Sequence, residues 1–209
     1  MYIFRIELVY STTGLCFFGE VKMISTDNFQ KLFNQIHPHF FEQEYLRNFS
    51  DEQTFDEMLL KLSEFDFHKY EKTFDSDISF DFFNGNESDL QEAVNKVNAN
   101  WLKYFCNRNQ RCYCVFAEGK IASFCLLTDM GTFDSDGKKL KIAGPGCVGT
   151  VPEFRDRGLG LTMVKNATQI LKEEGFDYSY IHYTAVAKWY AKLGYKTIMR
   201  WNKSGPVNF

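Results

Sequence analysis

The sequence predicts a mixed α/β fold in which helices flank one β-sheet. Two observations in the second half of the 209-residue chain carry this prediction. Residues 111–117 and 120–128 are apolar runs that flank Glu118 and Gly119, which is typical of a β-hairpin. After the hairpin, strand-like runs alternate with runs of helical spacing as far as residue 201. This order of elements predicts a sheet covered by helices.

The elements after the hairpin follow in the order strand, helix, strand, helix, strand. The first helix is predicted over residues 161–171, because apolar side chains recur there every three or four residues. Gly175 is expected to end it. A polar loop precedes the first strand, and Gly144-Pro145-Gly146 is expected to interrupt that strand. The predicted ranges are 132–139 for the loop, 140–150, 177–184 and 195–201 for the strands, and 185–193 for the second helix.

The first half of the chain is expected to contribute an early strand and helices to the same domain. Apolar stripes predict one helix over residues 26–36 and another over residues 51–64. The stretch from residue 65 to 83 fits no single pattern, although alternation predicts a strand at 78–82. The remaining expected elements are strands at 1–10 and 20–25, a turn at 11–14, and a helix at 89–105.

Charge is distributed unevenly along the sequence, whose net charge is −3. Residues 1–100 hold 8 Lys and Arg against 18 Asp and Glu, whereas residues 101–209 hold 16 against 9. The halves therefore carry −10 and +7. The basic half suits a polyphosphate-bearing cofactor, and the acidic half could attract a cationic substrate; alternatively, both are solvated faces that balance. No basic run interleaved with aromatic residues appears, which disfavours nucleic-acid binding.

Several further classes of protein are disfavoured by the sequence. Arg5 and Glu7 interrupt the N-terminus, and no apolar run approaches the length of a membrane span, so we expect a cytoplasmic protein without a membrane partner. The six cysteines are expected to be reduced and mostly packed. His37 and His39 flank Pro38 without a third ligand in reach, which indicates a turn and no metal site.

Residues 151–160, Val-Pro-Glu-Phe-Arg-Asp-Arg-Gly-Leu-Gly, predict an anion-binding turn between a strand and a helix. The first N–H groups of a helix lack intrahelical acceptors, and the helix dipole adds partial positive charge there. Gly158 and Gly160 have no Cβ, so a phosphate can approach the backbone closely. Arg155 and Arg157 stand beside these glycines and can form paired hydrogen bonds to phosphate oxygens.

Two motifs of this chain together resemble those of a known superfamily. The first is Val-Pro-x-Phe followed by Arg-x-x-Gly-x-Gly within residues 151–160, and the second is Tyr-x-x-x-Gly-Tyr within residues 187–195. In this order and spacing they resemble the GNAT superfamily of acetyl-CoA-dependent N-acetyltransferases, over roughly residues 110–201. The resemblance implies a mixed, mostly antiparallel, twisted sheet flanked by helices. It also implies one acetyltransferase domain over 1–209, in which residues 1–85 form an N-terminal extension or lobe and residues 110–201 carry the cofactor-binding core.

The resemblance also implies the roles of particular residues. The strand before the turn would offer backbone groups to the pantetheine arm of acetyl-CoA, and the turn itself would bind the pyrophosphate. Tyr190, four residues before Gly194, matches the family position proposed to protonate the departing thiolate; alternatively, its ring packs in the core. The implied cofactor-binding residues are Val148, Gly149, Thr150, Arg155, Arg157, Gly158, Leu159, Gly160 and Leu161.

The sequence departs from the family pattern at two places. Tyr183 stands where the family commonly has Asn, and residues 142–151 contain no acidic side chain that could serve as the base. Three residues remain as candidates for that base: His182, Asp129 and Glu20. Because His182 alternates with Tyr178 and Tyr180, a packed histidine is favoured over a catalytic one. Cys147 could in principle carry the acetyl group, but no histidine is placed beside it.

These features predict an acetyltransferase that moves an acetyl group from acetyl-CoA to a primary amine by direct attack in a ternary complex. The acceptor would be a small-molecule or peptide amine, and the acidic half of the chain would suit a cationic one. The alternative is a non-catalytic acyl-CoA-binding or interaction module, which the missing strand carboxylate and the change from Asn to Tyr favour.

Overall fold

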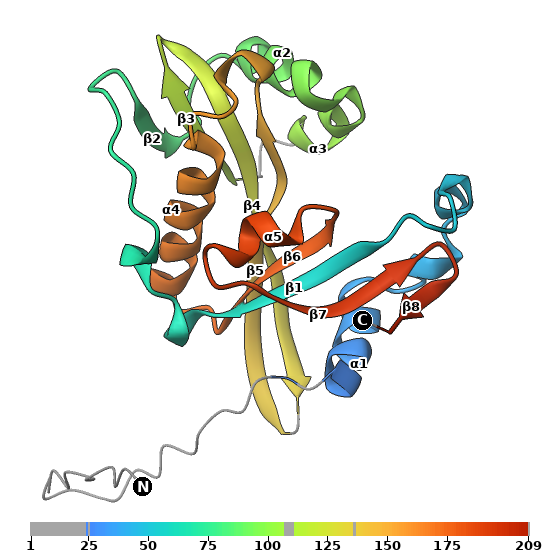
Figure 1. Cartoon of the computed structure of the whole chain (residues 1–209). Helices are drawn as coiled ribbons and strands as arrows, with labels where there is room; N and C mark the ends of the chain where they lie inside the picture. Colours follow the sequence, from blue (N-terminus) through green and yellow to red (C-terminus); the bar gives the residue numbers. More distant parts are fainter. Residues whose placement is uncertain (1–23, 25, 107–110, 136, 209) are drawn as a thin grey trace, which may run out of the picture.

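A computed structural model describes residues 24, 26–106, 111–135 and 137–208. Its centre is an eight-stranded sheet in the order β2-β3-β4-β5-β6-β1-β7-β8 (Figure 1). Only β5 and β6 pair in parallel, and every other neighbouring pair is antiparallel. The strands are β1 (Phe55–Lys61), β2 (Ser79–Phe82), β3 (Arg111–Ala117), β4 (Lys120–Ser135), β5 (Lys138–Thr150), β6 (Tyr178–Thr184), β7 (Lys196–Asn202) and β8 (Gly205–Val207). The predicted mixed, mostly antiparallel sheet is confirmed.

Helices cover both faces of this sheet. Side chains of α1 pack with Tyr178 and Tyr180, whereas side chains of α4 pack with Ile181. Because successive residues of β6 point to opposite faces, α1 and α4 lie on opposite sides of the sheet. The α-helices are α1 (Thr26–Ile36), α2 (Glu87–Asn98), α3 (Leu102–Phe105), α4 (Leu159–Glu173) and α5 (Ala187–Ala191); the 3₁₀ turns are η1 (Phe40–Glu42), η2 (Glu44–Asn48), η3 (Leu62–Glu64), η4 (Phe67–Lys69), η5 (Ala99–Trp101) and η6 (Pro152–Phe154). No described helix is both long and apolar enough to span a bilayer.

The helix predicted over residues 51–64 is wrong, because residues 55–61 form β1 instead. This strand lies between β6 and β7 and pairs with both, so six of its seven residues are buried. In a strand buried on both faces, apolar residues need not alternate. Phe55, Met58, Leu59 and Leu62 therefore had the spacing of one face of a helix although they are buried around a strand, and Asp56 and Glu57 are also buried.

The polar loop predicted at 132–139 and the interruption predicted at 144–146 are also wrong. Strands β4 and β5 continue through both regions as one long hairpin. The Asp134 carboxylate accepts a hydrogen bond of 3.1 Å from the N–H of Gly137, which stabilises a tight turn where a loop was expected. Pro145 stays within the strand, opposite Leu127.

The other expected elements agree with the structure within a few residues, with two exceptions. The helix predicted at 89–105 is divided into α2, η5 and α3, since the Asn98 backbone is extended and its side chain accepts from the N–H of Asn100. Strand β8 was not predicted. The strands expected at 1–10 and 20–25 and the turn at 11–14 lie outside the described residues, apart from Ile24.

Tyr195 links three elements inside the core. Its ring is buried, and its hydroxyl lies 2.8 Å from the hydroxyl of Thr168 in α4 and 2.7 Å from the hydroxyl of Ser179 in β6. A buried hydroxyl costs free energy unless it is hydrogen-bonded. The two contacts form only when α4 packs on β6, and they therefore stabilise that packing.

Replacing Tyr195 by Phe should lower the free energy of unfolding by about 1–3 kcal/mol, because two buried hydroxyls would each lose a partner. Urea denaturation monitored by fluorescence would measure the change. Tyr104→Phe is the matched control, since Tyr104 is 44% exposed and the same atom is removed in water. Equal stability of the two variants would contradict the importance of this buried contact.

Candidate active site

The site is built where β5 and β6 diverge. The two strands pair only at Ile142 with Tyr178 and at Ala143 with Ser179. At the next position, a Cβ on Gly144 would lie 1.9 Å from the carbonyl oxygen of Tyr180, so only glycine allows the strands to touch there. Further on, β5 continues along β4 and β6 continues along β1, which opens a cleft between the carboxyl ends of two parallel strands.

A β-bulge shapes β5 on its side of this cleft. Leu126 pairs with Gly146 and Phe124 with Gly149, so Cys147 and Val148 together face one residue of β4. Cys147 has φ of 47°, which marks the bulge, and a bulge leaves ladder hydrogen-bonding groups unpaired. Gly149 is required for packing, because a Cβ there would lie 2.5 Å from the ring of Phe124. The group that approaches the Gly149 backbone closely is therefore a side chain of the protein itself.

The predicted anion-binding turn leads from β5 into α4. Gly158 is the N-cap with φ of 78°, and no side chain caps the helix. The first N–H groups of α4 therefore have no side-chain acceptor, as an anion site requires. Gly160 faces the strand, because a Cβ on it would lie 2.7 Å from the hydroxyl oxygen of Thr150. The Arg155 Nε donates to the carbonyl oxygen of Thr150 at 3.2 Å and so braces the turn.

One cavity of about 680 Å³ gathers most of the predicted site residues. Nine of the ten line it: Val148, Gly149, Thr150, Arg155, Gly158, Leu159, Gly160, Leu161 and Tyr190. The tenth, Arg157, is not part of the lining, since its guanidinium contacts the Glu118 carboxylate at 3.3 Å and lies 5.6 Å from the centroid of the Phe154 ring. The other lining residues were not predicted to belong to the site. Four of them lie within the two motifs and four come from other parts of the chain: Phe154, Asp156, Trp189 and Lys192, and Tyr70, Lys72, Val97 and Val186.

Tyr190 projects from α5 into this cavity and is 6% exposed. Gly194, with φ of 100°, ends the segment after α5 and lets the chain turn into β7, which explains the Tyr-x-x-x-Gly spacing. Burial, and then the neighbouring Tyr195, raise the pKa of the Tyr190 hydroxyl above its ordinary value. The phenol therefore stays protonated and can donate a hydrogen bond into the cavity.

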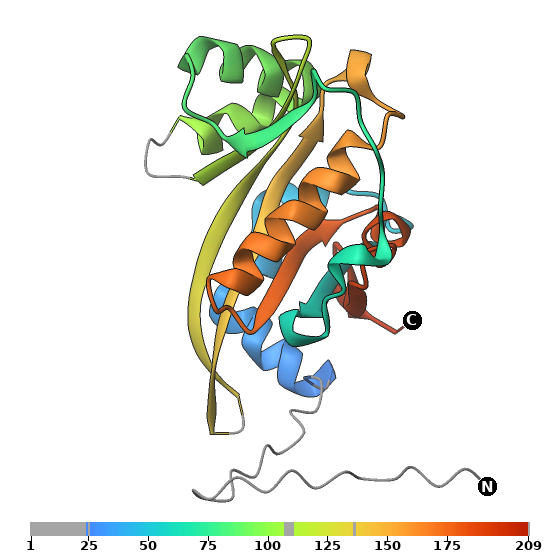
Figure 2. The same ribbon diagram turned by 90° about the vertical axis from the view of Figure 1, so that its left-hand side faces the viewer.

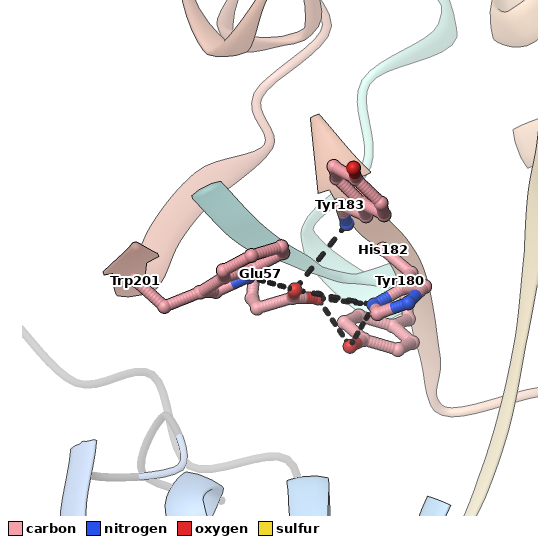
Figure 3. Close-up of polar contacts among 5 residues, drawn as sticks. All are labelled: Glu57, Tyr180, His182, Tyr183 and Trp201. Carbon is pink, nitrogen blue, oxygen red and sulfur yellow. Dashed lines mark hydrogen bonds and ion pairs between the residues drawn. The ribbon is translucent and has the colours of Figure 1, made fainter. Parts of the chain in front are cut away.

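A second polar cluster lies on the α1 face, around the buried carboxylate of Glu57 (Figure 3). Trp201 Nε1 donates to this carboxylate at 2.6 Å, the hydroxyl of Tyr180 donates a short hydrogen bond, and the N–H of Tyr183 donates at 3.3 Å. His182 Nδ1 lies 3.0 Å from the same group. Together these donors satisfy a charge that would otherwise be costly to bury.

The carboxylate also fixes the tautomer of His182. A carboxylate only accepts, so Nδ1 carries the hydrogen and Nε2 of the neutral ring bears the lone pair. The side chain of His182 is 26% exposed, and its ring stacks on that of His37 with centroids 3.9 Å apart. Burial, and then the nearby His182, lower the pKa of His37 to about 3, so His37 is neutral.

The remaining candidates for a proton acceptor or a nucleophile are less well placed. Asp129 accepts from the N–H of Gly131 at 2.8 Å in an exposed bend of β4, and Glu20 lies outside the described residues. Burial raises the pKa of the Cys147 thiol to about 11, which keeps it protonated and a weak nucleophile. Tyr183 packs in an aromatic cluster with Phe55 and Trp201 and does not line the cavity.

Glu57 was missed because residues 51–64 were interpreted as a helix. The sequence does contain one signal of a buried carboxylate: an acidic residue stands directly before a run of three apolar residues. If that run is a strand buried on both faces, the carboxylate is buried with it and needs hydrogen-bond partners. Within the described residues, no three His, Cys, Asp or Glu side chains converge as metal ligands do.

These features define a mixed α/β protein in which an uncapped helix N-terminus and a buried phenol lie near a divergence between parallel strands. A sequence model of the family described as the acetyltransferase (GNAT) domain matches residues 79–198, more than half of the chain. The protein therefore belongs to the GNAT acetyltransferase family. None of the curated proteins matches its sequence.

Solved structures with the same fold include a GCN5-related glucosamine N-acetyltransferase region of a fungal multi-domain GH3 β-N-acetylglucosaminidase. It is 19% identical, with a TM-score of 0.56 over 73% of this chain and 20% of that one. A GCN5-related N-acetyltransferase from Kribbella flavida is 15% identical, with a TM-score of 0.50 over 71% and 56%. A conserved protein of unknown function from Staphylococcus epidermidis is 10% identical, with a TM-score of 0.50 over 69% and 57%. This chain thus spans between a fifth and somewhat over half of these relatives.

Proposed function

We propose that this protein transfers an acetyl group from acetyl-CoA to a primary amine, by direct attack of the amine in a ternary complex. One observation carries the proposal: a single cavity joins the unpaired N–H groups of α4, the bulge in β5 and the phenol of Tyr190. Those are the groups that phosphate binding, carbonyl polarisation and thiolate protonation require.

The cavity fits a long, phosphate-bearing thioester. Its lining includes the positively charged side chains of Lys72, Arg155 and Lys192 against one acidic residue, Asp156. The pyrophosphate would lie at the N-terminus of α4, where Gly158 has no Cβ and only the flexible end of the Lys72 side chain covers the backbone. The pantetheine arm would follow the bulged end of β5 toward the divergence of the strands.

Tyr190 would stabilise the leaving group. When the new C–N bond forms and the C–S bond breaks, negative charge develops on sulfur, which needs a proton or a hydrogen bond. A free thiol titrates near pH ~8.5 and a phenol near pH ~10, so proton transfer from tyrosine is uphill. Burial raises the pKa of Tyr190 further. A strong hydrogen bond to the developing thiolate is therefore its main contribution.

His182 would accept the proton that the amine must lose. It lies two residues beyond Tyr180, where β5 and β6 separate, and its ring packs against α1, on the opposite face of the sheet from the residues that line the cavity. Glu57 holds its Nδ1–H and leaves Nε2 as the acceptor atom. The amine would then approach from the α1 face while the thioester lies on the α4 face.

Binding of the cofactor is tested by Gly158→Ala against Gly175→Ala. Both glycines have similar φ, 78° and 80°, so alanine costs each site about 1–2 kcal/mol of backbone strain. A Cβ on Gly175 meets nothing within 4 Å, whereas one on Gly158 fills the phosphate cradle. By calorimetry, the Kd of coenzyme A should rise about tenfold or more only in Gly158→Ala. Equal affinity in both variants would remove the pyrophosphate from this turn.

The role of Tyr190 is tested by replacing it with Phe, which keeps the ring and removes the hydroxyl. Because one hydrogen-bond donor to the developing charge is lost, we expect kcat for transfer to a panel of amines to fall about 10²–10³-fold, while the affinity for acetyl-CoA changes little. A ring that only packs predicts the opposite: normal turnover in Tyr190→Phe, with damage confined to Tyr190→Ala through a core cavity. Binding of acetyl-CoA without transfer by the unmodified protein would favour the non-catalytic alternative.

His182→Gln separates a catalytic histidine from a structural one by the choice of acceptor. An alkylamine with a pKa near ~10 is protonated at pH 7 and needs a base, whereas an arylamine is already neutral. The variant should lose about 10²–10⁴-fold in kcat/KM with alkylamines and much less with an arylamine. Glu57→Gln, which leaves His182 without its carboxylate, should show the same selectivity in weaker form. A uniform loss with both amines would assign His182 to packing alone.

A further inference from the structure

Residues 65–78 form a segment, here called the strap, that connects η3 to β2. It runs beside α4 from the C-terminal half of the helix toward its N-terminus (Figure 2). The whole strap precedes residue 79, where the match to the family begins. Its course along α4 therefore brings side chains from the first half of the chain to the cofactor cavity.

Contacts to α4 hold the first part of the strap in place. Phe65 is 4% exposed, and its carbonyl oxygen accepts a hydrogen bond of 2.8 Å from Lys172 Nζ. The ammonium of Lys165 lies 3.9 Å from the centroid of the Phe67 ring, a favourable cation–π distance. The first residues of the strap are thus attached to α4 at two positions that lie about two helical turns apart.

Two aromatic side chains fix the part that follows. Tyr70 packs against the core cluster that contains Tyr190, and Phe74 packs against the cluster that contains Leu159 at the start of α4. In an extended chain, residues two apart point to the same side. Lys72, midway between these two, therefore faces α4 as well, and it lines the cavity.

The side chain of Lys72 lies directly on Gly158. A Cβ built on Gly158 would be 2.7 Å from Cδ of Lys72 and 2.9 Å from its Nζ. An ammonium is a donor with no acceptor capacity, and the N-terminus of a helix presents further donors and partial positive charge. Lys72 forms no hydrogen bond or ion pair with the described residues. A cation at this position gains stabilisation only when an anion lies between it and the helix.

We infer that Lys72 is a pyrophosphate-binding residue, which closes the cradle of α4 from the side of the strap. This inference rests on the proposed function, since it requires coenzyme A in the cavity. On binding, the flexible Lys72 side chain moves off Gly158 and its ammonium pairs with a phosphate oxygen, while the helix N–H groups bind the other side. Gly158 then has two functions, because it admits the phosphate and accommodates the resting lysine.

The test compares the Kd of coenzyme A, by calorimetry, in the unmodified protein, in Lys72→Met and in Lys31→Met. Methionine keeps much of the apolar stem and removes the charge, and Lys31, exposed on α1, controls for the change in net charge. A charge-assisted contact that is partly screened by solvent predicts about 5- to 50-fold weaker binding in Lys72→Met alone. Added salt should reduce this difference.

Dephospho-coenzyme A, which keeps the pyrophosphate and lacks the 3′-phosphate, identifies the group that is bound. An equal loss in Lys72→Met with both ligands supports the pyrophosphate, and a loss seen only with coenzyme A overturns that assignment. Unchanged affinity in Lys72→Met, with tight binding by the unmodified protein, refutes the inference and leaves the proposed function intact. Failure of the unmodified protein to bind either ligand refutes both.

Discussion

The divergence of β5 and β6 is the constraint on which the site depends. Two parallel strands that paired along their whole length would leave no space for a thioester in the sheet. Here each strand takes a different antiparallel partner beyond Gly144 and Tyr180, so pairing energy is retained while the cleft opens. Neither strand is therefore left without a partner, and the separation is maintained by β1, which supplies the alternative partner for β6.

The buried carboxylate of Glu57 reinforces this arrangement. It accepts from Tyr180 and Tyr183 in β6 and from Trp201 in β7, so one side chain of β1 binds both neighbouring strands. Removing one member of such a cluster leaves a buried charge or donor uncompensated, which is more costly than any single contact would indicate. The same carboxylate accepts from His182, so the group that stabilises the divided sheet also determines which imidazole nitrogen carries the hydrogen.

The sequence predicted the residues that line the cavity beside α4 better than it predicted the cluster around Glu57, and the reason is physical. Residues 151–160 and 187–195 act through local backbone geometry, such as the positive φ of Gly158 and Gly194, which a short motif can encode. Glu57 acts through its contact with His182, and Lys72 acts through its contact with Gly158. In each pair the two residues lie on different elements and far apart in the sequence, so no local sequence pattern predicts the contact. The misassigned helix at 51–64 had the same origin, because a strand buried on both faces loses its alternation.

The two halves of the chain consequently contribute different parts of the proposed enzyme. The match to the family begins at residue 79 and includes the turn, α4, Tyr190 and β6, which are the parts that a common cofactor demands. Glu57 and Lys72 both precede it, in β1 and in the strap. Residues 1–100 carry a net charge of −10, so a lysine that reaches the N-terminus of α4 is the exception in its own half. A cation in an acidic segment, held between the partly buried rings of Tyr70 and Phe74, suits the anion that we propose the other half of the protein binds.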